Sequence, residues 1–157
     1  MNSQSQMSRS ERRVRLAGVA AAVLVAELIW IAAELVFDIR LQATAGNGYP
    51  EPVDISPLTV AVASLALSLL GWAVLSVLER LTRHARRIWL SLALVALAVS
   101  LSMPLSGTGI TVGNRIVLVL MHVAVAAVVI PVLYRTSPRQ LAPVSQVPSA
   151  IAKGEAA

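Results

Sequence analysis

Four long apolar stretches separated by polar segments dominate the pattern of hydrophobic and polar positions along this chain. They run over residues 14–37, 57–78, 88–105 and 116–134, so each is 18–24 residues long. A helix of about 20 residues is long enough to cross the roughly 30 Å hydrocarbon core of a bilayer. The pattern therefore predicts an all-α fold, a polytopic membrane bundle of four transmembrane helices.

The polar segments carry signals that begin or end helices. In the loop after the first stretch, Gly-Asn-Gly and Tyr-Pro-Glu-Pro favour irregular structure. Ser56 followed by Pro57 is typical of an N-cap residue and the first helical position. Residues 1–13 form a basic N-terminal segment. Residues 135–157, with three prolines and little apolar content, are expected to form a disordered tail.

Composition shows that most of the chain needs an apolar environment. It is 57% hydrophobic and 13% charged, whereas an average soluble domain is about 45–50% apolar and about 25% charged. The partner for this excess is the lipid bilayer. A formal net charge of +5 would suggest nucleic acid if the charges formed one patch. They lie instead at the ends of the apolar stretches, so we expect no nucleic-acid partner.

The basic residues are distributed unevenly between the two sides of the predicted bundle. Eleven of the 13 lysines and arginines lie on one side: four at residues 9–15, four in the connector of residues 79–87 and three in the tail. The other side has Arg40 and Arg115. Cytoplasmic loops carry such an excess. We therefore expect a multi-pass protein of the bacterial plasma membrane with both termini cytoplasmic. Trp89 and Tyr134 would lie in the cytoplasmic aromatic belt, and the connector would attract anionic lipid head groups.

Three segments together are similar to a known family. They are GWAVLSVLERLTRHARRIW at residues 71–89, LSMPL at 101–105 and VLMHVAVAAVVIP at 119–131. This set resembles a family of small four-span integral membrane proteins of unknown function, found mainly in actinobacteria. The likeness extends from the first apolar stretch to the fourth. It implies four helices in the plasma membrane and no particular activity.

Two acidic residues interrupt the first apolar stretch. Glu27 and Glu34 are seven residues apart, about two helical turns, so they share one face of the helix. A carboxylate near the centre of a bilayer costs at least a few kcal/mol unless it is paired, neutral or hydrated, so we expect Glu27 not to face lipid. On another side of the helix, small residues at four-residue spacing allow a second helix to approach closely: Gly18, Ala22 and Ala26.

The fourth stretch holds polar residues at matching depths. His122 follows Arg115 by seven residues, so these two also share a face. At about 1.5 Å per residue, His122 lies about 9 Å below the outer boundary, between Glu34 at about 5 Å and Glu27 at about 15 Å. If the first and fourth helices are neighbours, His122 can reach either acid, and Arg115 lies near Glu34.

Two functions fit this candidate polar site of Glu27, Glu34, His122 and Arg115. In the first, it is a buried clasp between the first and fourth helices of a structural or accessory membrane protein. That clasp would pair Glu27 with His122 and Glu34 with Arg115. In the second, Glu27 is the coupling acid of a small oligomeric proton- or cation-coupled transporter. Both leave open whether the protein contacts a second copy of itself or another membrane protein.

No set of residues in the sequence supports catalysis. The chain has no cysteine, no metal-ligand spacing, and no nucleophile with an adjacent base. We therefore expect no enzymatic activity, no catalytic residues, no resident metal and no cofactor.

Overall fold

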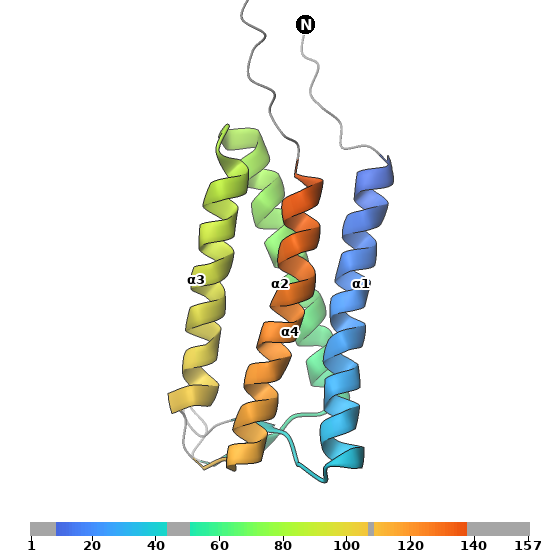
Figure 1. Cartoon of the computed structure of the whole chain (residues 1–157), viewed down its shortest axis with the longest axis vertical. Coiled ribbons are helices and arrows are strands. Elements are labelled where there is room, and N and C mark those ends of the chain that lie inside the picture. Colours follow the sequence, from blue (N-terminus) through green and yellow to red (C-terminus); the bar gives the residue numbers. More distant parts are fainter. Residues whose placement is uncertain (1–8, 44–50, 107–108, 138–157) are drawn as a thin grey trace, which may run out of the picture.

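The computed structural model describes residues 9–43, 51–106 and 109–137, and most of them form long helices (Figure 1). Helix α1 (Arg9–Ile31) continues into a π-helical segment, η1 (Ala32–Val36), and is followed by α2 (Pro57–Leu81), α3 (Ala85–Ser106) and α4 (Val112–Thr136). Each of these four stretches is long and apolar enough to cross a membrane. The four predicted spans are therefore confirmed as helices, while the predicted tail beyond residue 137 lies outside the described residues.

The helices form one antiparallel bundle. Helix α1 packs against α2 and α4, and α3 packs against the same two helices. In the view of Figure 1, α1 and α3 lie on the two sides, with α4 in front and α2 behind. The first and fourth helices are thus neighbours, which is the condition that the predicted clasp required.

Local capping fixes where two of the helices begin. The side chain of Ser56 accepts a hydrogen bond from the backbone N–H of Thr59 at 3.2 Å, and Pro57 occupies the start of α2, as predicted. Thr111 accepts in the same way from the N–H of Asn114, so α4 begins four residues before the predicted stretch. A capping hydroxyl satisfies an N–H group that has no partner within the helix.

The half of the bundle near the α2–α3 connection is filled by a cluster of Leu75, Trp89 and Leu133. Trp89 is 3% exposed, and its indole N–H donates to the carbonyl oxygen of Gly71 at 2.9 Å. The prediction that Trp89 lies in an interfacial belt is therefore wrong. Its ring turns inward because the indole N–H finds a backbone acceptor inside the bundle.

The loop after η1 is more regular than the sequence indicated. Strand β1 (Gln42–Ala43) pairs antiparallel with β2 (Val53–Asp54), with Gln42 opposite Asp54. Just before it, Asp38 adopts a left-handed backbone conformation with φ 51°, which turns the chain out of η1. Leu41 is 1% exposed and packs with Ala33 and Leu118, so the loop covers the end of the bundle.

Candidate functional site

A buried charged residue ties three helices together at the end where α1 begins. Arg15 of α1 is 1% exposed. Its Nη2 lies 2.8 Å from Oε1 of Glu79 in α2, and Nη2 also donates to the carbonyl oxygen of Thr136 in α4 at 2.9 Å. Its Nε donates to the Thr136 hydroxyl at 3.0 Å. We call Arg15, Glu79 and Thr136 the Arg15 clasp.

The Arg15 clasp satisfies groups that the helices cannot satisfy alone. The guanidinium spreads its donors in a plane that matches a carboxylate, and its Nη1 reaches the second oxygen of Glu79 at 3.5 Å. Thr136 lies in the last turn of α4, where backbone carbonyl groups have no partner within the helix. This end of the helix also carries the negative end of the helix dipole. The Thr136 hydroxyl in turn donates to the carbonyl of Val132 at 2.8 Å.

Sequence reasoning assigned Arg15 to the basic N-terminal segment and Glu79 to the connector, and missed that they meet. A signal was present, because Arg15 precedes Gly18, Ala22 and Ala26 by three, seven and eleven residues and so lies on the same helical stripe. A charge on a stripe of small residues faces the neighbouring helices.

The stripe itself packs as expected. Ala22 and Ala26 are fully buried. A Cβ atom built on Gly18 would lie 2.6 Å from Cγ1 of Val132, closer than any real contact, so only glycine lets α1 come this near to α4. The predicted close approach of a second helix is confirmed, and the neighbour at Gly18 is α4.

Glu27 lies about one turn before Trp30, on the same side of α1. Trp30, three residues beyond Glu27, donates its indole N–H to the carbonyl of Ile55, just ahead of α2, at 2.8 Å. Glu27 is twelve residues beyond Arg15, about 18 Å along the helix. Because α2 runs antiparallel to α1, the matching position in α2 lies twelve residues before Glu79, at Leu67, next to Ser68. The Oε1 atom of Glu27 and the hydroxyl of Ser68 are both buried, and neither has a hydrogen-bond partner among the described residues.

His122 is not hydrogen-bonded to this Glu27 oxygen. Its Nδ1 lies 2.7 Å from the carbonyl oxygen of Leu118, one turn earlier in α4, and can donate to it. Gly18 lies against Val132 of α4. Glu27 is nine residues further along α1, roughly two and a half turns, and so lies on the opposite side of that helix.

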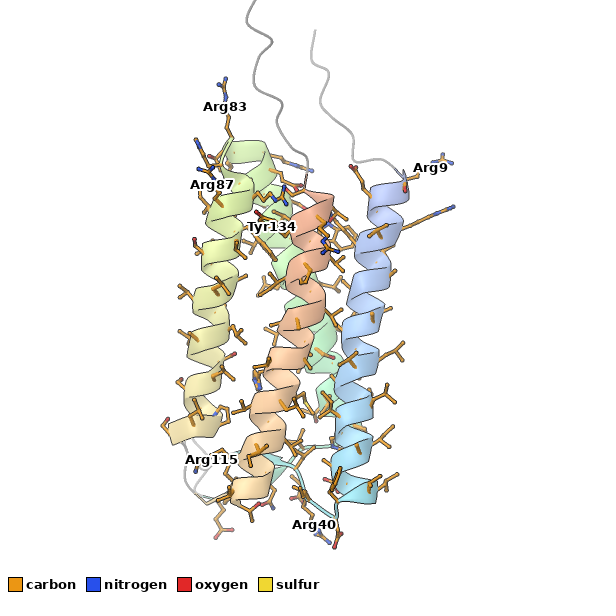
Figure 2. All side chains as sticks on the ribbon, viewed as in Figure 1. Arg9, Arg40, Arg83, Arg87, Arg115 and Tyr134 are labelled. Atoms are coloured by element: carbon orange, nitrogen blue, oxygen red, sulfur yellow. The ribbon has the colours of Figure 1, made fainter. Side chains whose placement is uncertain are left out.

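Glu34 and Arg115, the second predicted pair, each have a backbone partner. Oε1 of Glu34, within η1, accepts from the backbone N–H of Leu41 at 2.8 Å. Arg115 donates from Nη1 to the carbonyl of Leu105 at the end of α3. Arg115 and Arg40 lie at one end of the bundle, opposite Arg9, Arg83, Arg87 and Tyr134 (Figure 2). Glu34 therefore holds the loop through a backbone group.

Two further side chains hold the loop at this end. The amide of Asn114, which is 1% exposed, donates from Nδ2 to the carbonyl of Gln42 at 2.9 Å. Trp30 binds Ile55 as described above. Together with Glu34, these residues connect β1, β2 and the residues beside them to the α1–η1 helix and to α4. The sequence did not single out Asn114, because nothing local marks a polar residue that will meet a distant carbonyl.

Four antiparallel apolar helices, tied by buried polar contacts at both ends, define the chain as a multi-pass membrane protein of the four-helix bundle class. A family model described as a family of unknown function, DUF6069, matches residues 6–139. The chain belongs to this family. The match covers nearly all of the chain, in agreement with the resemblance to a family of unknown function. No curated protein and no solved structure matches the chain.

Proposed function

We propose that this protein is a structural or accessory component of the bacterial plasma membrane that acts through helix and lipid contacts and has no catalytic activity. The observation that carries the proposal is the Arg15 clasp, which links α1 to α4 through Thr136 and to α2 through Glu79. A buried ion pair adds little net stability compared with well-packed apolar side chains, and we infer that this one serves to fix the relative positions of the helices. An arrangement of this kind suits a fixed scaffold.

Both halves of the bundle support the same conclusion. Leu75 and Leu133 are at most 1% exposed and fill the half near the clasp. Ala33, Leu41 and Leu118 fill the other half, beneath the tied loop. A solute crossing a single copy would have to displace these side chains. The packed interior therefore favours a scaffold over a pathway within one chain.

The charge distribution supports an orientation with both termini cytoplasmic. In Figure 2, Arg9, Arg83 and Arg87 lie at one end, while Arg40 and Arg115 lie at the other. Basic residues concentrate on the cytoplasmic side of membrane proteins. We assign the end with Arg9 to the cytoplasm and the tied loop to the outside.

The second candidate function is a proton- or cation-coupled transporter that works as an oligomer. One observation favours it. Glu27 Oε1 and the Ser68 hydroxyl are buried and have no hydrogen-bond partner within the part of the chain that the structure describes. Intramembrane acids are costly and frequently serve ion or proton pathways. In this candidate, Glu27 would take up the transported ion, and Ser68 would supply a neutral oxygen.

Flux through reconstituted liposomes separates the two functions. We expect the wild-type protein to pass protons and sodium ions no faster than protein-free liposomes, monitored with pH- and sodium-sensitive dyes trapped inside. Glu27→Gln should give the same trace, and its melting temperature in detergent should fall if the carboxylate is a structural partner. Glu34→Gln is the matched control at the outer end. A wild-type flux that disappears in Glu27→Gln and persists in Glu34→Gln would overturn the scaffold proposal.

A further inference from the structure

The connection between α2 and α3 gathers positive charge with little acid nearby. Residues 57–106 contain one acid, Glu79, and it is already paired with Arg15. The arginines of the connection are Arg80, Arg83, Arg86 and Arg87. The first turn of α3 holds no acid, although a helix N-terminus carries partial positive charge. Arg86 and Arg87 in that turn therefore add like charge to the positive end of the dipole.

One of these arginines is held in place before any ligand arrives. The guanidinium carbon of Arg86 lies 3.5 Å from the centre of the Tyr134 ring, in a cation–π contact between α3 and α4. Its Nε is buried and has no hydrogen-bond partner among the described residues. Arg86 is only partly buried, so a guanidinium held in place by this stacking is preorganised to bind an anion at the surface.

Apolar side chains flank the arginines on the surface of the bundle. Leu81 is 76% exposed and Ile88 is 40% exposed. Arg83 and Arg87 are exposed beside them, at the same end as Tyr134 (Figure 2). Positive charge directly next to exposed apolar surface fits a molecule with an anionic head and hydrocarbon tails.

We propose that Arg86, with Arg83 and Arg87, binds the head-group phosphate of an anionic phospholipid in the leaflet at this end of the bundle. Guanidinium groups recognise phosphate oxygens by paired, charge-assisted hydrogen bonds. Leu81 and Ile88 would contact the upper part of the acyl chains. The inference rests on the membrane placement proposed above and is independent of whether the protein conducts ions, so failure of one leaves the other standing.

The test compares lipid binding by the full chain in nanodiscs of phosphatidylcholine with and without phosphatidylglycerol. We expect phosphatidylglycerol to raise the melting temperature of the wild type, and native mass spectrometry to retain it in preference to phosphatidylcholine. Arg86→Gln should weaken retention about tenfold, the loss expected for one charge-assisted contact of roughly 1.4 kcal/mol. Tyr134→Leu, which keeps the charge and removes the stacking, should weaken it in the same direction. Arg40→Gln, an exposed arginine at the opposite end, is the matched control and should bind as the wild type does.

Two arms keep the proposal falsifiable. If Arg86→Gln does not fold, the double variant Arg83→Gln, Arg87→Gln removes two exposed charges from the same site, and it should lose the preference for phosphatidylglycerol. Inorganic phosphate added to phosphatidylcholine nanodiscs should not stabilise the wild type, because it has no acyl chains. Equal stabilisation by inorganic phosphate, or equal loss in Arg40→Gln and Arg86→Gln, would overturn the lipid site.

Discussion

Arg15 is a full charge on the buried face of an apolar helix, where losing its water costs several kcal/mol unless other groups replace it. In place of water, a carboxylate, a hydroxyl and a backbone carbonyl accept hydrogen bonds from the guanidinium. Glu79 is 19% exposed, so the clasp opens toward the aqueous end of the bundle on the side of α2. The position suits a residue that anchors the end of α1.

Replacing Arg15 should therefore leave the Glu79 carboxylate and the Thr136 carbonyl without their hydrogen-bond donor. We expect Arg15→Met to lower the free energy of unfolding by about 3 kcal/mol, since Glu79 keeps its charge and loses its counter-ion. Unfolding in mixed detergent, followed by tryptophan fluorescence, measures the loss. In a double-mutant cycle with Glu79→Gln, the combined loss should be smaller than the sum by about 1–3 kcal/mol. Arg13→Met, at an exposed position two residues away, should change stability by less than about 0.5 kcal/mol. Equal losses for both arginines would remove the special role of Arg15.

Among the helices, the contact between α1 and α4 depends on the absence of a side chain at Gly18. The neighbour there is Val132, whose β-branched side chain has little rotational freedom to move aside. At Gly71 in α2, an added Cβ would meet only Cδ1 of Leu133, at an ordinary 3.8 Å. The two glycines thus differ in what surrounds them, although both interrupt apolar helices.

This difference predicts that the same substitution destabilises the protein at Gly18 and changes its stability little at Gly71. Gly18→Ala should destabilise the protein by about 1–3 kcal/mol, because the extra methyl forces α1 and α4 apart. Gly71→Ala should stay within about 1 kcal/mol of the wild type, with helix propensity in its favour. Thermal unfolding in one detergent gives both values. Val132→Ala combined with Gly18→Ala should recover part of the loss, and a failure to recover would point away from the α1–α4 contact as the cause.

For the molecule as a whole, the two ends differ in both charge and construction. The end with Arg9 holds the connector arginines and the Arg15 clasp. The opposite end holds η1 and the tied strands, with the acids Glu34, Asp38 and Asp54. We expect a bundle so polarised to insert in one direction, because basic segments are retained in the cytoplasm.

The orientation can be read with single cysteines, because the chain has none of its own. In the proposed orientation, Glu51→Cys in the loop between η1 and α2 should react with a membrane-impermeant maleimide on intact spheroplasts. His84→Cys in the connector should react only after the membrane is permeabilised. Both positions are exposed, so access and not burial decides the labelling. The reverse pattern would place the arginine-rich end outside and contradict the proposed orientation.

The sequence by itself determined the four helices, their order and the start of α2, because apolar length and capping are local properties read within a few turns. Ser56 and the stripe of Gly18, Ala22 and Ala26 behave as their neighbours along the chain predict. The direction in which the face with Glu27 and Glu34 points, and the inward turn of Trp89, could not be predicted in this way. Each depends on how far a helix rotates about its axis when it meets the others.

Only the tertiary structure decided which polar groups meet. Arg15 finds Glu79 at a separation of 64 residues and Thr136 at 121, and no local pattern links such positions. Glu27 and His122 lie at similar depths along the helix axes, but whether two side chains meet also depends on the rotation of each helix about its axis. Gly18 lies against Val132 of α4, and Arg15, one turn earlier in α1, makes the polar side-chain contact between the first and fourth helices.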